Sequence, residues 1–279
     1  MATRHISFAG RTAAVDYRGA AARDLLEFLY RDIPPDLDAA PPHIRLRLES
    51  SAGGGVELWI GSSCLKRDDC GGGQVADALL SETLFHLADW ADQGMVFHSA
   101  ALARGGKGLL LPGYSGAGKS TLTAWLVQRK FNYLTDELVY VPRGSMRAQA
   151  FTRPINIKHP AMPVLYRLAP ALESQRSRFV ETPVATLVPH RLLNRRHRRE
   201  TPLITTALFP EYRAGSSFEM RLLTPAETAM ALMGCLINAR NLENNGFTEA
   251  IRVARGIRAY RMVYGGFEQL DERFFDVLP

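Results

Sequence analysis

Alternating apolar and polar positions at the start of the chain predict a small α+β unit. The predicted elements are strands at residues 5–17, 44–50 and 56–62 and a helix at residues 21–33. The proline-rich residues 34–42 cannot continue a helix and therefore predict a connection. The glycines of CGGG, residues 70–73, predict a flexible joint and a domain boundary.

The pattern changes after this joint to longer apolar runs that alternate between helical and strand-like spacing. The predicted elements are helices at residues 74–93, 120–131 and 225–239 and strands at residues 97–104, 107–113, 133–141, 201–209 and 218–223. Between residue 150 and the strand at 201–209 the chain contains many prolines and reads as irregular. We expect an α/β fold with two domains, a small N-terminal α+β subdomain at residues 1–73 and a larger domain at residues 74–279.

Composition excludes several classes of protein. With 46% hydrophobic and 22% charged residues in 279, the chain is typical of soluble globular proteins. No apolar run approaches the roughly 20 residues needed to span a bilayer, and the first residues lack the apolar segment of a secretory signal. Three cysteines, Cys64, Cys70 and Cys235, form no CxxC pair and predict neither a disulfide framework nor a structural zinc site. We expect a cytoplasmic protein that does not associate with membranes.

Positive charge is concentrated in HRLLNRRHRRE, residues 190–200, in a chain with a formal net charge of +6. The run contains no aromatic residue on which a base could stack, which argues against a nucleic-acid partner. Its arginines could dock an acidic peptide or cover a bound nucleotide, and a solvated surface is an equally good reading.

The stretch GYSGAGKST matches the phosphate-loop pattern GxxxxGK[ST] through Gly113, Gly118, Lys119 and Ser120. Glycines let several backbone N–H groups point at one anion, and the N-terminus of the following helix adds positive charge. Lys119 would reach the β and γ phosphates of a nucleotide, and the Ser120 hydroxyl suits Mg²⁺. Many classes of protein bind nucleotides through such a loop.

Three further side chains would equip a bound phosphate for transfer. Asp136 and Glu137 begin 17 residues after Lys119, and their apolar neighbours Leu134 and Leu138 favour a functional position over a solvated turn. His98 lies 21 residues before Lys119, on the strand that precedes the loop strand. On spacing alone it is more often a core histidine, although a neighbouring strand could present it to the γ phosphate.

The order FHSAAL, GLLLPGYSGAGKST and YLTDELV resembles the catalytic core of the HPr kinase/phosphorylase family. The similarity is to the shorter HPr-kinase-related proteins found beside peptide-modification genes, including those that phosphorylate lasso-peptide precursors. It covers roughly residues 95–141 and is faint afterwards. The resemblance implies a P-loop kinase core of the HPr kinase/PEP carboxykinase type. It also implies a possible homo-oligomer, because members of the family often form oligomers.

Carried over residue by residue, the resemblance also implies roles. Asp136 would accept the proton of the substrate hydroxyl, Ser120, Asp136 and Glu137 would hold Mg²⁺, and His98 would contact phosphate. The implied ATP-binding residues are Gly113, Tyr114, Ser115, Gly116, Ala117, Gly118, Lys119, Ser120 and Thr121. Candidates for contacting phosphate or substrate are Arg153 and Lys158, in the segment RPINIK, and Arg198 and Arg199, although spacing does not separate these two from Arg195 and Arg196.

The departures from the family pattern bear on the identity of the phosphate acceptor. Glu137 stands in place of the second aspartate, Thr121 replaces an acidic residue, and the family's LEIRGLG signature is absent. HPr itself is therefore a doubtful acceptor.

The sequence predicts an ATP-dependent and Mg²⁺-dependent kinase that phosphorylates a serine-type hydroxyl of a protein or peptide, which could be acidic. Two alternatives stay open. The chain could be a nucleotide-binding regulatory or peptide-handling module without kinase activity, or a kinase of a small hydroxylated molecule.

Overall fold

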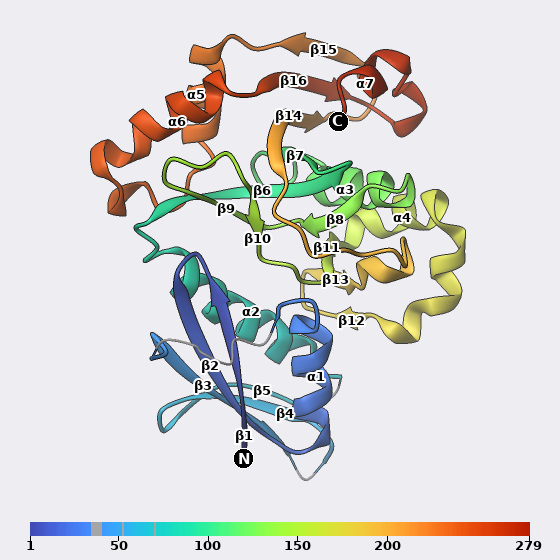
Figure 1. The fold of residues 1–279 in the computed structure, drawn as a ribbon. Helices are drawn as coiled ribbons and strands as arrows, with labels where there is room; N and C mark the ends of the chain where they lie inside the picture. Colours follow the sequence, from blue (N-terminus) through green and yellow to red (C-terminus); the bar gives the residue numbers. More distant parts are fainter. Residues whose placement is uncertain (35–40, 52, 70) are drawn as a thin grey trace. The chain divides into compact units, whose positions relative to one another are not determined.

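The computed structural model describes residues 1–34, 41–51, 53–69 and 71–279, and its fold is mixed α/β (Figure 1). The chain divides into two compact units, Met1–Ala91 with Thr152–Leu193 and Asp92–Phe151 with Asn194–Pro279. It therefore passes between the units three times. No helix among the described residues has both the length and the apolar character needed to cross a membrane.

The first unit contains a five-stranded sheet in the order β1-β2-β3-β4-β5 (Figure 1). Its elements are β1 (Ala2–Phe8), β2 (Arg11–Arg18), α1 (Ala20–Tyr30), β3 (Ile44–Ser50), β4 (Val56–Ile60), β5 (Ser63–Asp68) and α2 (Gly73–Ala88). The expected strand at residues 5–17 is instead two antiparallel strands, because Ala9 and Gly10 turn the chain with φ of 52° and 77°. Most of the connection expected at residues 34–42, and Cys70, lie outside the described residues.

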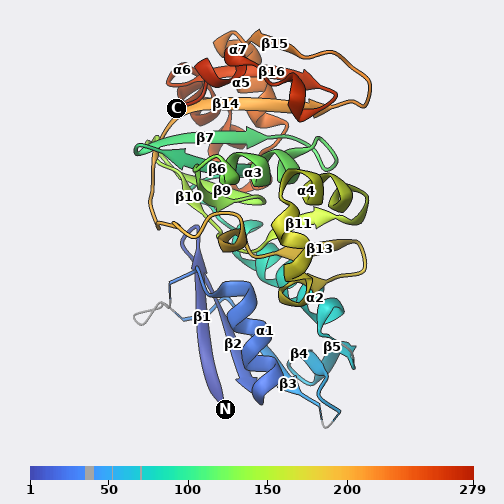
Figure 2. The same ribbon diagram turned by 90° about the vertical axis from the view of Figure 1, so that its right-hand side faces the viewer.

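Residues 152–193 of the first unit are regular where the prolines predicted irregular chain. A three-stranded sheet joins β11 (Ile155–Lys158), β13 (Ala185–Val188) and β12 (Val180–Glu181), accompanied by α4 (Met162–Leu168) (Figure 2). Its 3-10 helices are η1 (His159–Ala161), η2 (Pro170–Arg178) and η3 (His190–Leu192). The backbone at Gly73, the first residue of α2, lies directly against the Glu181 carbonyl of β12. The division expected at residue 73 thus differs from the compact units, since α2 packs on the strands of the first one.

The second unit is built on an eight-stranded sheet in the order β10-β9-β6-β7-β14-β16-β15, with β8 also paired to β6. Its strands are β6 (Gly94–Arg104), β7 (Lys107–Pro112), β8 (Asn132–Thr135), β9 (Leu138–Pro142), β10 (Gln149–Ala150), β14 (Leu203–Tyr212), β15 (Glu219–Leu222) and β16 (Arg258–Tyr264). The central strands β7, β14 and β16 are parallel, so their carboxyl ends meet at one edge of the sheet.

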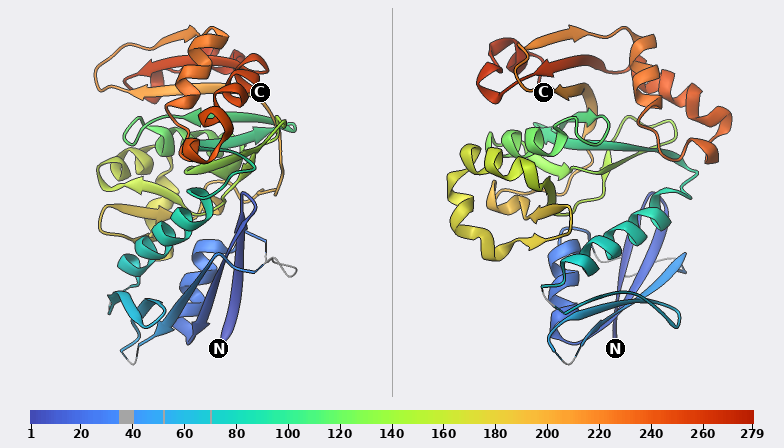
Figure 3. Two further views of the ribbon diagram at one scale, coloured as in Figure 1. Left: turned by 90° about the vertical axis from the view of Figure 1, so that its left-hand side faces the viewer. Right: turned by 180° about the vertical axis from the view of Figure 1, so that it is seen from behind.

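Helices complete the second unit, and α5 and α6 lie side by side (Figure 3). The helices are α3 (Lys119–Gln128), α5 (Pro225–Met233), α6 (Phe247–Arg255) and α7 (Glu272–Asp276), with 3-10 helices η4 (Ala239–Asn241), η5 (Glu243–Gly246) and η6 (Phe267–Gln269). Leu232 of α5 and Val253 of α6 share a buried cluster with Met95 and Phe97 of β6. Because side chains alternate along a strand, His98 of β6 lies on the opposite face of the sheet.

Candidate functional site

The glycine-rich loop connects the end of β7 to the start of α3. Gly116 and Gly118 adopt φ of 93° and 88°, which side chains with a Cβ rarely reach, and Gly118 is the N-cap of α3. In an α-helix the first N–H groups have no partner within the helix, and those of α3 follow directly after this loop. A strand, a glycine loop and a helix N-terminus in this order suit an anion such as phosphate.

Lys119 lies within the loop and is only 6% exposed. Its Nζ donates hydrogen bonds to the carbonyl oxygens of Gly113, at 2.7 Å, and Tyr114, at 2.9 Å. The ammonium group is thereby held against the backbone of the loop.

Asp136 and Glu137 occupy a break between β8 and β9, although the sequence predicts one continuous strand at residues 133–141. Both strands pair with β6, and the Ser99 N–H donates to the Glu137 carbonyl at 3.0 Å. The Thr135 hydroxyl accepts the Glu137 N–H at 3.1 Å and donates to the Phe151 carbonyl at 2.8 Å. These bonds fix the backbone at the bend that carries the two carboxylates.

Asp136 is buried, at 2% exposure, and reaches the loop directly. Its Oδ2 accepts a hydrogen bond from the Ser120 hydroxyl at 3.1 Å, and its Oδ1 accepts one from the Tyr133 hydroxyl at 3.1 Å. The contact joins two residues that the sequence separates by 16 positions.

His98 lies at the same level of the sheet as the loop and the bend. The neighbouring Ser99 faces Pro112, the last residue of β7, and bonds to Glu137 on its other side. The imidazole Nε2 is 3.7 Å from Glu137 Oε1, and both side chains are partly exposed. The structure therefore brings His98 to the same end of β7 as the loop and the acidic pair.

Cys235 is a member of this site that the sequence did not indicate. Its carbonyl accepts the His98 N–H at 2.8 Å, and Ile237 donates to Val96 at 3.0 Å, so this segment lies beside β6 where β7 has ended. Burial raises the pKa of the Cys235 thiol, while nearby Lys119 and a hydrogen bond from the Gly113 backbone oppose the shift. The apolar pattern predicted that the helix would continue to residue 239, but α5 ends at Met233.

A scan against protein-family models found no match for the chain, and a search of the curated proteins found none either. The function must therefore be argued from the site. Its groups fit a nucleotide with a divalent cation: backbone N–H groups and an ammonium for phosphate, and the oxygens of Ser120, Asp136 and Glu137 for Mg²⁺, which prefers such ligands.

The other predicted residues are divided between the two units. Arg153, which is buried, and Lys158, the exposed last residue of β11, belong to the first unit, whereas the loop belongs to the second. Arg198 is exposed in the second unit, where its backbone N–H donates to the Asn132 side chain and its carbonyl accepts from it. Arg199 is exposed next to it.

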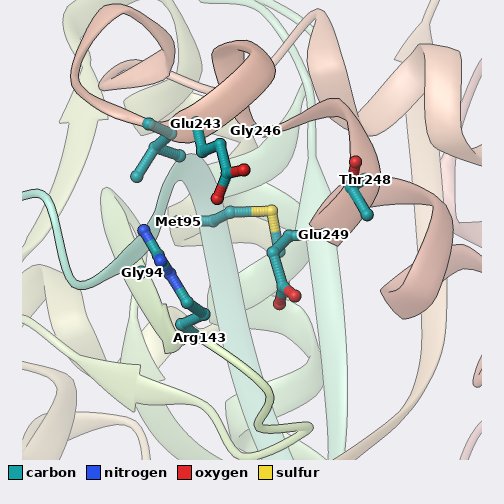
Figure 4. Close-up of a pocket in the computed structure, with 8 residues that line it drawn as sticks. Gly94, Met95, Arg143, Glu243, Gly246, Thr248 and Glu249 are labelled. Atoms are coloured by element: carbon teal, nitrogen blue, oxygen red, sulfur yellow. The ribbon is translucent and has the colours of Figure 1, made fainter.

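Two cavities, one in each unit, are lined by other residues. In the second unit a cavity of about 110 Å³ is lined by residues that include Met95, Arg143, Gly246 and Glu249 (Figure 4). The Glu249 carboxylate is already bound by the Gly144 N–H and by Arg252. In the first unit a more open cavity of about 590 Å³ is lined by residues that include His159, Tyr166, Arg176 and Glu181.

Proposed function

We propose that the protein is an ATP-dependent kinase that transfers the γ-phosphoryl group to a serine-type hydroxyl of a protein or peptide. The observation that carries the proposal is the 3.1 Å hydrogen bond from Ser120 to the buried carboxylate of Asp136. Ser120 has the loop position that contacts Mg²⁺ in phosphate loops. In a site that only binds an anion, a carboxylate at this position would repel the phosphate. In a site for phosphoryl transfer the same carboxylate can bind the metal ion and accept a proton, and both are needed.

In this proposal the loop N–H groups and Lys119 hold the β and γ phosphates of ATP. Ser120, Asp136 and Glu137 supply oxygens for Mg²⁺, which offsets the negative charge of the phosphates when bound. Two hydroxyl donors fix the Asp136 side chain in one orientation, so little rearrangement is needed before the reaction.

Transfer would proceed in one direct in-line step. Asp136 takes the proton of the acceptor hydroxyl while that oxygen bonds to the γ phosphorus, and the bond from phosphorus to the β–γ bridging oxygen breaks to release ADP. In this proposal His98, which lies 3.7 Å from Glu137, contacts the phosphoryl oxygens through a protonated imidazole.

We also propose that the chain is related to the HPr kinase/phosphorylase family, and the same geometry supports this. A histidine strand, a phosphate loop and an acidic bend that meet at one level of a mixed sheet are what an HPr-kinase-like P-loop core of the HPr kinase/PEP carboxykinase type requires. The mixed α/β fold and the small α+β part at the N-terminus are compatible with it.

The decisive experiment measures transfer and nucleotide binding separately. With γ-labelled ATP, Mg²⁺ and a degenerate serine-peptide library, we expect labelled peptide from the wild type and a loss of about 100-fold or more with Asp136→Asn. The affinity of Asp136→Asn for ATP measured without Mg²⁺ should stay within about threefold of wild type, because the loop and Lys119 hold the phosphates. Glu137→Gln, on the same bend, is the matched control and should mainly raise the Mg²⁺ concentration required.

Each alternative has its own outcome in this assay. Full transfer by Asp136→Asn would refute the base assignment. ATP binding without consumption in the presence of any peptide or small hydroxylated compound would favour a passive module. Consumption that only small hydroxylated compounds stimulate would assign the acceptor to that class.

A further inference from the structure

Two exposed tyrosines flank the glycine loop on opposite sides. Tyr114, within the loop, is 73% exposed, and its hydroxyl lies near Gly234, where a Cβ would stand 3.0 Å from it. This is the β6 side of the loop, because Cys235 next to Gly234 bonds to His98. Tyr212, the last residue of β14, is 45% exposed and lies on the other side.

Backbone contacts fix Tyr212 against the loop. Its N–H donates to the Ala117 carbonyl at 3.2 Å, and a Cβ on Gly118 would stand 2.9 Å from the Tyr212 Cβ. The next residue, Arg213, donates to the Tyr264 carbonyl at 3.0 Å. A side chain held this closely beside a phosphate loop is within reach of whatever is attached to the phosphates.

The Tyr212 ring is supported from behind by other aromatic rings. Tyr264, its partner across β14 and β16, packs edge to face against it with centroids 5.6 Å apart, and the Tyr264 hydroxyl donates to the Gly118 carbonyl at 3.4 Å. Phe267 packs on Tyr264, and Trp125 of α3 packs on Phe267. Because neighbouring rings already restrict the half-exposed Tyr212 ring, it loses little conformational entropy when a planar ligand stacks on it.

The sheet order indicates which end of a nucleotide would lie there. Asp136 and His98 are on the β6 side of β7, and in the proposed function they act on the γ phosphate. A nucleotide whose γ end points to that side directs its nucleoside across β7, toward the carboxyl ends of the parallel strands β14 and β16. Those ends are Tyr212 and Tyr264.

We propose that the exposed face of Tyr212, supported by Tyr264, is the stacking platform for the nucleobase of the bound nucleotide. This inference rests on the proposed function, because that function sets the direction in which the nucleotide lies across the loop. The polar side chain of Gln269 is engaged within the protein: it accepts the Gly265 N–H and donates to the Ser216 carbonyl, each at 3.0 Å. Stacking, which every purine can provide, therefore contributes more to nucleotide affinity than hydrogen bonds to the edges of the base.

The test compares ATP with inorganic tripolyphosphate, which carries the phosphates without a base, by calorimetry on the full chain. Tyr212→Ala should raise the Kd for ATP by about tenfold and leave the Kd for tripolyphosphate within about twofold. Phe247→Ala, which removes an exposed aromatic ring from α6, should change neither affinity. Tyr212→Trp should retain ATP affinity, and its added fluorescence should respond to ATP but not to tripolyphosphate.

The possible failures are distinguishable. If Tyr212→Ala binds ATP as the wild type does, or loses both ligands equally while remaining folded by circular dichroism, the platform is refuted. If Tyr114→Ala alone lowers ATP affinity selectively, the base lies on the other side of the loop and the platform is again refuted. If wild-type protein binds neither ligand, the proposed function itself fails.

Discussion

The Cys235 thiol lies against the first glycine of the phosphate loop, and its pKa is a property that can be tested without knowing the acceptor. Burial raises this pKa, so the thiolate needed for alkylation forms only at higher pH. We expect the alkylation rate of Cys235 to rise with an apparent pKa above that of an ordinary cysteine, and bound ATP to slow it further. Mass spectrometry after iodoacetamide treatment resolves each cysteine.

Cys64 is the internal control for that experiment, since it is exposed and free and belongs to the first unit. ATP should leave its alkylation unchanged. An alkylation profile of Cys235 like that of an ordinary cysteine, or equal effects of ATP on both thiols, would contradict the placement of Cys235 beside the loop.

Individual site residues were predictable from the sequence where their chemistry is encoded locally. Lys119 and Ser120 belong to a motif with fixed spacing, and Asp136 followed from an acidic pair between apolar residues. Cys235 and Tyr212 carried no such signal, because each reaches the loop through pairing between distant segments of the sheet. Only the arrangement of β6, β14 and their neighbours brings them there.

At the scale of elements, the turn from β7 into α3 depends on Gly118 more than on Gly116, although both have positive φ. A Cβ on Gly118 would stand 2.5 Å from the Tyr264 hydroxyl and 2.9 Å from the Tyr212 Cβ, whereas one on Gly116 meets nothing within 4 Å. Gly116→Ala should therefore cost only the backbone strain, roughly 1–2 kcal/mol of unfolding free energy. Gly118→Ala should cost about 1–3 kcal/mol more because of overpacking.

Urea unfolding of the two variants measures this difference, and each variant serves as the control for the other. Similar unfolding free energies would mean that Tyr264 and Tyr212 do not pack against Gly118 as described.

Elements were predictable where one periodicity extends over several residues, and not where a turn interrupts it. The apolar pattern of residues 133–141 is continuous, yet hydrogen bonds of Thr135 bend the chain at Asp136 and separate β8 from β9. Ala9 and Gly10 likewise convert an apparent strand into a hairpin. Such breaks depend on side chain to backbone bonds and on φ, neither of which affects the hydrophobic pattern.

At the scale of the whole chain, the pattern of apolar and polar positions predicted an α/β protein but not how segments are shared between the units. Residues 152–193 looked irregular because their strands are short and their prolines numerous, and they are ordered by pairing among β11, β12 and β13. The contact between Gly73 and Glu181 joins this segment to α2 within one unit. No pattern within either segment encodes that contact.

The net charge leads to a prediction about the acceptor. Arg195, Arg196, Arg198 and Arg199 are all exposed, and replacing them with serine removes four positive charges, from a formal net charge of +6 to +2. Exposed charges contribute little to folding, so the unfolding free energy should change by no more than about 0.5 kcal/mol. They raise the rate at which an acidic partner associates, and salt screens this effect over about 8 Å at physiological ionic strength.

Under the proposed kinase function, we therefore expect the quadruple variant to phosphorylate serine peptides flanked by glutamate with a higher KM than the wild type at low salt. The difference should shrink as salt is raised, because the same charges are then screened in the wild type. Serine peptides flanked by lysine are the matched control and should show no such increase, and the Kd for ATP should stay within about twofold. An unchanged KM for the acidic peptides at every salt concentration would show that these arginines serve only as a solvated surface.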